Sequence, residues 1–509
     1  MNCFSFESSL RLRFSALSLF IGMFLVAGES TASAQFDDLL RRIPSDATAI
    51  IVMDVKGIHQ SPIAVRRHWG QKHEQAYMQS PLILPPEADR IVLAADVDAS
   101  NGFETEWEMA VMSLTEPIQM RSVARAESGY LDKLNGLEVA WTPSNAYFVG
   151  FEEKTLGAMF PAERKDVSRW IGFAQRNRDV LISDYLVSAA KKVNQKTQIV
   201  LAIDLKDVID PHELSEKLST STVLKGNTRK AEQLFPIILG IQGATLSVNL
   251  GVTAEGTLRV DFASDAAPFA NFARPMLFHA LNNVGANIGE LEKWTTKIDG
   301  NSITATGRMS DTQLRRVFSL LEIPSTKFSS LKDEDVESPG SADQVAKKSK
   351  TYYSAVNTLI EDLRKTLEDT RDNHAVWMER YARKVDRLPL LHVDKDLLDW
   401  GANVGETFRV MALSTRSSGI KTGVRKSSVY GRYQLNYHDT GGVAYRGRYG
   451  AGYASSGYTT ARKTSSVKAQ IRTEERAKAK AVRYESWKSM EDATAAIRRR
   501  MTERYQVEF

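Results

Sequence analysis

Two apolar segments, 150 residues apart, place the strongest constraint on the fold of this chain. Thr48–Val55 reads T-A-I-I-V-M-D-V, and Gln198–Leu205 reads Q-I-V-L-A-I-D-L. Both are short, rich in β-branched residues and contain an Asp near the end, which is the pattern of a buried β-strand. The elements expected after each segment also follow the same order. The sequence therefore predicts a tandem duplication of a β-α-β-β-α-β-β unit, and two unrelated α+β segments are the alternative.

Turn residues mark the strands of the first unit. Ser61-Pro62 predicts the start of a helix after the first strand. Arg90–Val97 and Glu104–Leu114 are joined by a segment that contains Asn-Gly, a strong hairpin signal. Gly136–Trp141 and Ala146–Phe151 predict a second hairpin. The second unit repeats this order, with a helix from Pro211, a hairpin of Gly243–Leu250 with Thr257–Phe262, a helix over Ala267–Asn283, and a hairpin of Thr296–Ile298 with Ser302–Arg308.

The last third of the sequence has helical periodicity. Apolar residues three and four positions apart predict one long helix from Val345 to Leu388, which Pro389 ends. Asp394 is a suitable N-cap for a helix over Lys395–Leu413. Thr415–Thr464 is rich in Gly, Ser, Tyr and Arg, so we expect an extended or disordered insertion. Helical spacing returns from Ser466, and this second long helix could lie antiparallel to the first.

These patterns predict an α+β fold: a duplicated unit followed by an elongated all-α helical hairpin or bundle, with coiled-coil character. The expected division is a signal peptide (1–34), repeat 1 (35–195), repeat 2 (196–324), a polar linker (325–344) and the helical domain (345–509) with its insertion (415–464). Because 36–324 has its own strands and turns, we expect it to fold without the helical domain.

The N-terminus has the pattern of an export signal. Arg11 and Arg13 precede an apolar run from Phe14 to Ala27, and Ala32-Ser33-Ala34 offers small residues for cleavage. The run is shorter than a membrane-spanning helix. We expect cleavage after Ala34 and a periplasmic or extracellular protein; an uncleaved N-terminal anchor is the alternative.

The only cysteine, Cys3, lies in this leader. The mature protein would therefore contain no disulfide, no thiolate nucleophile and no cysteine–metal site. No later segment is apolar over the ~18 residues that a transmembrane helix needs.

Charge is distributed unevenly along the chain. Gln35–Ala342 has 33 Lys and Arg against 40 Asp and Glu, about −7, whereas Asp343–Phe509 has 32 against 20, about +12. The excess is concentrated between Arg416 and Lys480, where 14 basic residues face three acidic ones. Interleaved cations and aromatic rings suit polyanions. We expect an anionic envelope polymer or lipid headgroups as partner, bound through Arg425, Lys426, Arg432, Arg446 and Arg448; a solvated linker without function is the alternative.

The sequence contains no recognisable motif of a hydrolase, zinc protease, P-loop or dinucleotide-binding protein. His392, Asp394 and Asp396 could coordinate a cation, but a helix cap is the simpler interpretation. Glu104, Glu106 and Glu108 alternate along a strand and could bind calcium, although a solvated sheet face is expected. His374 is expected on the seam of the long helix as a core or register-setting residue. No metal, cofactor or catalytic residue is therefore predicted.

One resemblance extends over most of the mature chain. The opening I-P-x-D-A-x-A-I-I-V-M-D-V (Ile43–Val55) and the L-P-L-L-H-V-D step (Leu388–Asp394) resemble uncharacterised exported proteins of planctomycete-type bacteria. The resemblance implies a bacterial envelope setting and no particular activity.

We therefore expect a non-enzymatic, envelope-associated scaffold whose basic helical arm contacts anionic surfaces. A protein partner of the helical hairpin is a further candidate, and nucleic acid is not expected in this compartment. The alternative is a periplasmic carrier or sensor that binds an apolar or lipid-like ligand between the two repeats. A hydrolase ranks third, because no nucleophile–base spacing supports it.

Overall fold

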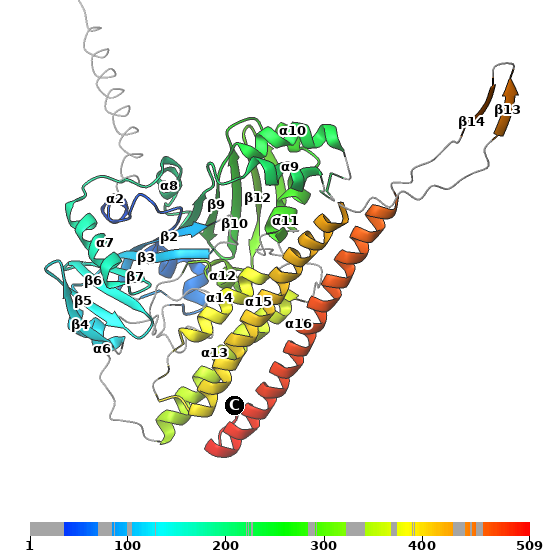
Figure 1. Ribbon diagram of the computed structural model, residues 1–509. Helices are drawn as coiled ribbons and strands as arrows, with labels where there is room; N and C mark the ends of the chain where they lie inside the picture. The colour runs from blue at the N-terminus through cyan, green and yellow to red at the C-terminus, as the bar shows by residue number, and fades with distance from the viewer. Residues whose placement is uncertain are drawn as a thin grey trace, which may run out of the picture.

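A large antiparallel sheet organises the computed structural model of the protein (Figure 1). In the described residues, twelve strands form this sheet in the order β11-β12-β10-β9-β8-β1-β2-β3-β7-β6-β5-β4. The structure describes residues 35–69, 84–85, 87–98, 104–127, 129–219, 221, 223–224, 227–283, 291, 293–321, 342–367, 374–388, 390, 392–430, 443–447, 450–454 and 462–509.

Two adjacent strands from distant parts of the sequence form the middle of the sheet. β1 (Ala49–Asp54) pairs antiparallel with β8 (Ile199–Asp204), with Ile51 opposite Leu201. These are the two apolar segments that the sequence singled out. Side chains on both faces of β1 are buried, which explains why the strand is a continuous apolar run rather than an alternating one.

The remaining strands extend outward on both sides of this pair. On the β1 side they are β2 (Ala88–Asp98), β3 (Glu104–Leu114), β7 (Thr155–Phe160), β6 (Ala146–Glu152), β5 (Leu137–Thr142) and β4 (Tyr130–Leu134). On the β8 side they are β9 (Ile241–Leu250), β10 (Ala254–Phe262), β12 (Ser302–Met309) and β11 (Thr295–Asp299).

One face of the β1 half is covered by helices close to it in the sequence. They pack over Ile50, Val52 and Val200 in one apolar cluster. These helices are α2 (Asp37–Leu40), α7 (Arg164–Arg176) and α8 (Asp184–Ala190). At the far end of the β8 half a smaller cluster contains α9 (Pro211–Ser219), α10 (Thr228–Leu239), the 3-10 helix η1 (Ala267–Phe269) and α11 (Ala273–Asn283).

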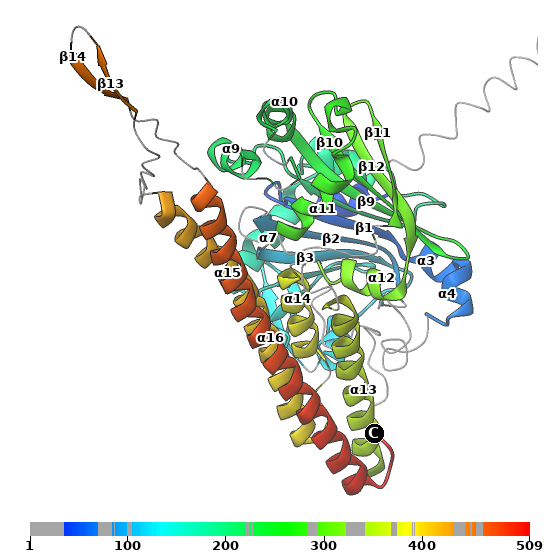
Figure 2. The ribbon, with the colours of Figure 1, turned by 90° about the vertical axis from the view of Figure 1, so that its right-hand side faces the viewer.

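The opposite face of the sheet carries the largest core, which continues into the C-terminal helices (Figure 2). Sheet residues such as Leu93 and Met112 belong to the same cluster as Trp377 and Phe408. Local helices contribute α3 (Val55–Gln60), α4 (Pro62–Arg66), α6 (Met120–Ala126) and α12 (Asp311–Val317). The C-terminal region contributes α13 (Ala342–Leu367), α14 (Ala375–Asp386), α15 (Lys395–Tyr430) and α16 (Arg462–Tyr505).

The expected α+β class is confirmed, with an antiparallel sheet and a helical C-terminal region, but the expected single helix from Val345 to Leu388 is wrong. The chain forms α13 and α14 instead, and His374 at the N-cap of α14 has a non-helical backbone (φ −121°). The sequence just before it, D-T-R-D-N, is rich in residues that favour turns and caps over helix interiors. Helical periodicity on both sides masked this break.

The expected extended insertion over 415–464 is also wrong in part. α15 continues to Tyr430, and β13 (Val443–Gly447) pairs with β14 (Gly450–Ala454). Ser, Thr and Gly are weak helix formers, but α16 packs along α15 and tertiary contact overrides propensity.

Repeat 1 contains more strands than the sequence predicted. Four strands, β4 to β7, follow α6 where one hairpin was expected. The apolar pattern of β7 is interrupted by Gly157. A larger residue would not fit at this position, because a Cβ there would come within 2.6 Å of both Phe151 and Trp170. Those two rings pack edge to face with their centroids 5.1 Å apart.

The expected signal peptide and most of the expected linker lie outside the described residues.

Candidate functional site

The candidate site is the arm, which we define as the antiparallel pair α15 and α16. The two helices run side by side along one side of the molecule (Figures 1 and 2). Phe408 on α15 and Trp487 on α16 lie with ring centroids 6.3 Å apart. Further along, Arg483 donates a hydrogen bond of 3.2 Å to the hydroxyl of Thr415. These contacts define the register of the two helices.

Asp394 fastens one end of the arm. One of its carboxylate oxygens accepts a hydrogen bond from the backbone N–H of Asp396 at 2.8 Å, as an N-cap does. The other oxygen accepts from Arg504 at 2.6 Å and from the hydroxyl of Tyr505 at 2.7 Å. Burial alone would raise the pKa of Asp394, but these donors lower it below its ordinary value. The cap interpretation of this motif therefore holds, and α16 supplies two further donors to the carboxylate.

The C-terminus is packed beside this cap. Phe509 is 7% exposed and stacks on Tyr505 with ring centroids 6.0 Å apart. Tyr353 on α13 meets Phe509 edge-on at 6.1 Å and stacks on Trp400 of α15 at 5.3 Å. The end of the chain is therefore an integral part of the helical region.

A buried cluster joins the helical region to the sheet. Glu108 on β3 is only 2% exposed and is surrounded by three guanidinium groups, two from α14 and one from the residue that follows it. Arg380 donates to it at 3.0 Å, Arg383 donates to the same oxygen, and Arg387 lies 3.5 Å from the other oxygen. We call these four residues the Glu108 cluster.

The electrostatics of the Glu108 cluster keep the carboxylate ionised. Burial alone would raise the pKa of Glu108, but Arg383, Arg387 and Arg380 outweigh it and lower the pKa to about 2. Phe160, directly opposite Glu108 on β7, lies under the guanidinium groups of Arg383 and Arg387 at 5.8 and 5.2 Å. The expected solvated position of Glu108 is therefore wrong: Glu106 is exposed, but Glu108 is a buried counter-ion.

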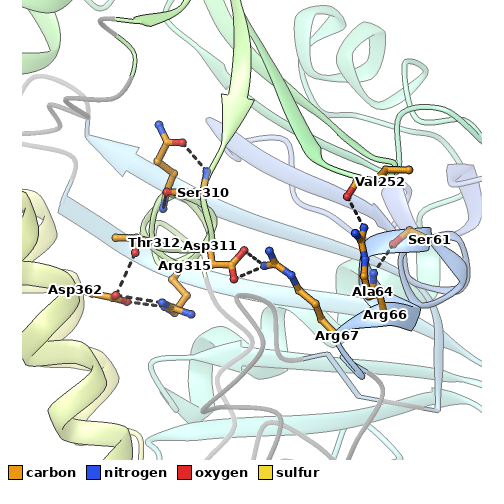
Figure 3. A network of polar contacts seen from close by, with 11 residues as sticks. Ser61, Ala64, Arg66, Arg67, Val252, Ser310, Asp311, Thr312, Arg315 and Asp362 are labelled. Carbon is orange, nitrogen blue, oxygen red and sulfur yellow. Dashed lines mark hydrogen bonds and ion pairs between the residues drawn. The ribbon is translucent and has the colours of Figure 1, made fainter.

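A second polar contact attaches α13 to α12 (Figure 3). Asp362 on α13 is 3% exposed and accepts hydrogen bonds from Thr312 at 3.2 Å and from Arg315 at 2.5 and 3.1 Å. Asp311, also on α12, pairs with Arg67 just after α4. Elements from both halves of the sheet and from the helical region therefore meet at α12.

The five residues expected to bind anionic surfaces belong to the arm or to its insertion. Arg425 and Lys426 fall within α15, and Arg446 falls within β13. Arg432 and Arg448 lie outside the described residues. The side chains of all five are outside the described part of the chain, so their grouping stays a prediction.

Metal binding has no support in the described residues. Among them, no three His, Asp or Glu side chains gather as a metal site would require. His374, expected on a helix seam, is instead the buried N-cap residue of α14. Likewise, within the described residues no helix has the length and apolar character needed to cross a bilayer.

An open groove of about 900 Å³ lies between α13 and α16. Tyr353 and Ile360 contribute apolar surface, and Arg364 forms an ion pair of 2.8 Å with Glu491 at its side. This groove lies within the helical region. The carrier hypothesis expected a cavity between the two repeats instead.

The sequence-based reasoning missed the three arginines of the Glu108 cluster. Their spacing at positions 380, 383 and 387 places them on one face of a helix, which was a usable signal. Their partner on β3 could not be identified, because 272 residues separate it from Arg380.

No family model and no curated protein matches this chain. Among solved structures, the chain is similar to crystal forms of the Treponema protein TP0453. Form I has 13% sequence identity and a TM-score of 0.33, covering 56% of this chain and 97% of that chain. Form III has 11% identity and a TM-score of 0.33, covering 54% and 95%. Form IV has 13% identity and a TM-score of 0.30, covering 55% and 95%.

Proposed function

We propose that this protein is an exported, non-enzymatic interaction protein of the bacterial envelope, in which the sheet is the folded body and the arm contacts anionic surfaces. One observation carries the proposal. The arm is fastened at the Asp394 end, whereas the strongly basic sequence 416–480 belongs to its other end. An arm that is attached to the protein at one end and strongly charged at the other is suited to contacting an anionic surface.

Charge supplies the expected attraction. Residues 416–480 have a net charge of about +11, and 35–342 has about −7. An anionic surface would attract the arm and repel the body, which favours one orientation. Because exposed charges are screened beyond ~8 Å at physiological salt, such binding would depend strongly on ionic strength.

The non-enzymatic assignment rests on the contacts made by the buried carboxylates. Glu108 and Asp362 are each bound by arginines, and Asp394 is bound by Arg504 and Tyr505. Carboxylates held in this way connect elements of the fold, and they suit a structural role better than proton transfer.

Export is the second element of the proposal, and its support is the leader with its A-S-A cleavage site. The mature chain would begin at Gln35. N-terminal sequencing of the protein recovered from the envelope fraction tests this directly, and retention of residues 1–34 would contradict cleavage.

We further propose that the body arose by duplication. The strand order supports this, because it can be read outward from the β8–β1 pair on both sides. β2 and β3 correspond in position to β9 and β10, and β7 corresponds to β12. Repeat 1 would then have gained an additional hairpin, β4–β5, at its edge.

The central test is co-sedimentation with anionic vesicles and with an acidic glycan across a salt series. Replacing Arg425, Lys426, Arg432, Arg446 and Arg448 by Ser should abolish most of the binding and leave folding intact. A matched control replaces five exposed cations of the body: Lys56, Arg121, Lys133, Lys206 and Arg229. If the arm variant binds as strongly as the wild type, or if binding does not depend on salt, the proposed role of the basic segment is contradicted.

A further inference from the structure

The C-terminal half of α16 has one face that points away from the rest of the molecule. Met490, Ile497 and Met501 are buried in the core that α16 shares with α15. At 3.6 residues per turn, Asp492 and Arg499 lie on the opposite side of the helix, and both are exposed. Figure 2 shows α16 in front of α15, on the outside of the molecule. We call this side of the helix the outer face of α16.

Four charged residues follow one another along the outer face: Lys488, Asp492, Arg499 and Glu503. All four are exposed, and within the described residues none of their side chains forms an ion pair or a hydrogen bond. In each of the two pairs that are four residues apart, the cation comes first, which is the less favourable order for pairing within a helix. The charges of the outer face are therefore not neutralised by contacts within the chain.

The order of these charges is self-complementary. Along the helix they read positive, negative, positive, negative, and the midpoint of the series lies halfway between Asp492 and Arg499. If a second outer face is placed antiparallel about this midpoint, Asp492 lies opposite Arg499 of the partner subunit, and Lys488 lies opposite Glu503 of the partner subunit. Two-fold symmetry repeats both pairs, which gives four ion pairs in all. A parallel arrangement would place like charges opposite one another.

We propose that the outer face of α16 is an interaction surface for a second copy of this chain, which pairs with it through antiparallel α16 helices. The observation that selects a second copy is that every charge finds its counterpart at the symmetry-related position. Ala495 and Ala496 lie at the midpoint, where small side chains let the two helices approach closely. Because exposed ion pairs contribute little each and are screened by salt, the dimer is weak and salt-sensitive.

This inference goes beyond the proposed function, which does not require self-association. The midpoint lies near the C-terminal end of α16, a helix that begins at Arg462. In an antiparallel pair the longer N-terminal parts of the two helices would therefore extend in opposite directions. The dimer would present two basic ends to its surroundings instead of one.

An exchange of charges tests the pairing in the whole chain from Gln35. Sedimentation velocity over a concentration series should show wild-type dimers at low salt that dissociate at high salt. In Arg499→Asp two attractive pairs become repulsive, so association should be at least about tenfold weaker, and Asp492→Arg should behave in the same way. A mixture of these two variants should associate again, because each acidic position then meets a basic one. Arg121→Asp, which makes the same change of charge at an exposed position of the body, is the control.

Three outcomes of this experiment would overturn the proposal. They are a wild type that stays monomeric at every concentration, single variants that associate as strongly as Arg121→Asp, and a mixture that stays monomeric. Circular dichroism of each variant verifies that the exposed substitutions leave the fold intact.

Cross-linking tests the antiparallel orientation independently. Since Cys3 is the only cysteine, the chain that begins at Gln35 contains none. Ala495→Cys lies at the midpoint and should form a disulfide-linked dimer on mild oxidation, since a disulfide needs Cα atoms about 4.4–6.8 Å apart. Glu485→Cys is exposed about 16 Å further along the helix, so that the two copies of this residue would lie about 30 Å apart and should not cross-link. A cross-link at position 485, or none at position 495, would overturn the antiparallel pairing.

Discussion

Arg380 and Glu108 lie 272 residues apart in the sequence and form an ion pair of 3.0 Å between α14 and β3. Both side chains are almost completely removed from water. Isolated charges are costly to bury, so each depends on the other for its place in the core. The pair makes the helical region and the sheet one packed structure.

The first prediction concerns the charge of Glu108. Glu108→Gln keeps the size of the side chain but leaves three guanidinium groups around a neutral amide. We expect a loss of about 3–5 kcal/mol in the free energy of unfolding, the range found when one partner of a buried pair is removed. Urea unfolding of the chain from Gln35 measures it.

The matched control is Glu106→Gln, on the same strand but exposed. It should change stability by less than about 0.5 kcal/mol. A loss for Glu108→Gln no larger than that of the control would show that the buried charge is not needed.

The second prediction is a dependence on pH. The pKa of Glu108 is about 2 in the folded protein against an ordinary value of 4.5, so the unfolded chain binds more protons between these values. The contribution of Glu108 is therefore fully present above about pH 4.5 and is lost as the pH falls toward 2. The difference in unfolding free energy between wild type and Glu108→Gln should shrink over this range, and a constant difference from pH 6 to pH 3 would contradict the assignment.

The third prediction concerns a fragment of residues 35–324. The sequence favoured its independent folding, but the core on one face of the sheet continues into α13–α16. Without these helices, apolar surface is exposed and Glu108 loses its counter-ions. We expect a fragment that is sensitive to protease and unfolds with low cooperativity, as measured by limited proteolysis and circular dichroism. A protease-resistant fragment with a sharp unfolding transition would instead show that residues 35–324 fold independently.

Local signals in the sequence predicted most elements but not how the large parts meet. β1 and β8 were recognisable because strands buried on both faces are apolar throughout. Ser61 and Asp394 were recognisable because cap residues act on backbone groups two or three positions away. The same local rules failed at His374, where helical spacing on both sides concealed a break.

The Glu108 cluster was harder to predict from the sequence. Glu108 alternates with Glu104 and Glu106 as a solvated strand residue would, and nothing near it in the sequence distinguishes it. Its burial depends on Arg380, Arg383 and Arg387, which are brought to it only by tertiary packing. Pairings of this kind are not contained in periodicity or propensity.

The last prediction concerns the end of the arm at Asp394. Asp394→Ala removes the N-cap of α15 together with the acceptor for Arg504 and Tyr505, and we expect a loss of about 2 kcal/mol. Asp394→Asn should cost less, because Asn caps helices as well as Asp does, so that only the oxygen that accepts from Arg504 and Tyr505 is replaced by an amide NH2 group. Asp399→Ala, an exposed residue one turn into α15, is the control. Hydrogen exchange should rise over residues 498–509 in Asp394→Ala, since the C-terminal turn of α16 loses the hydrogen bonds that Arg504 and Tyr505 donate to Asp394. Unchanged protection there would mean that the aromatic packing of Phe509 is sufficient to hold the end of the chain.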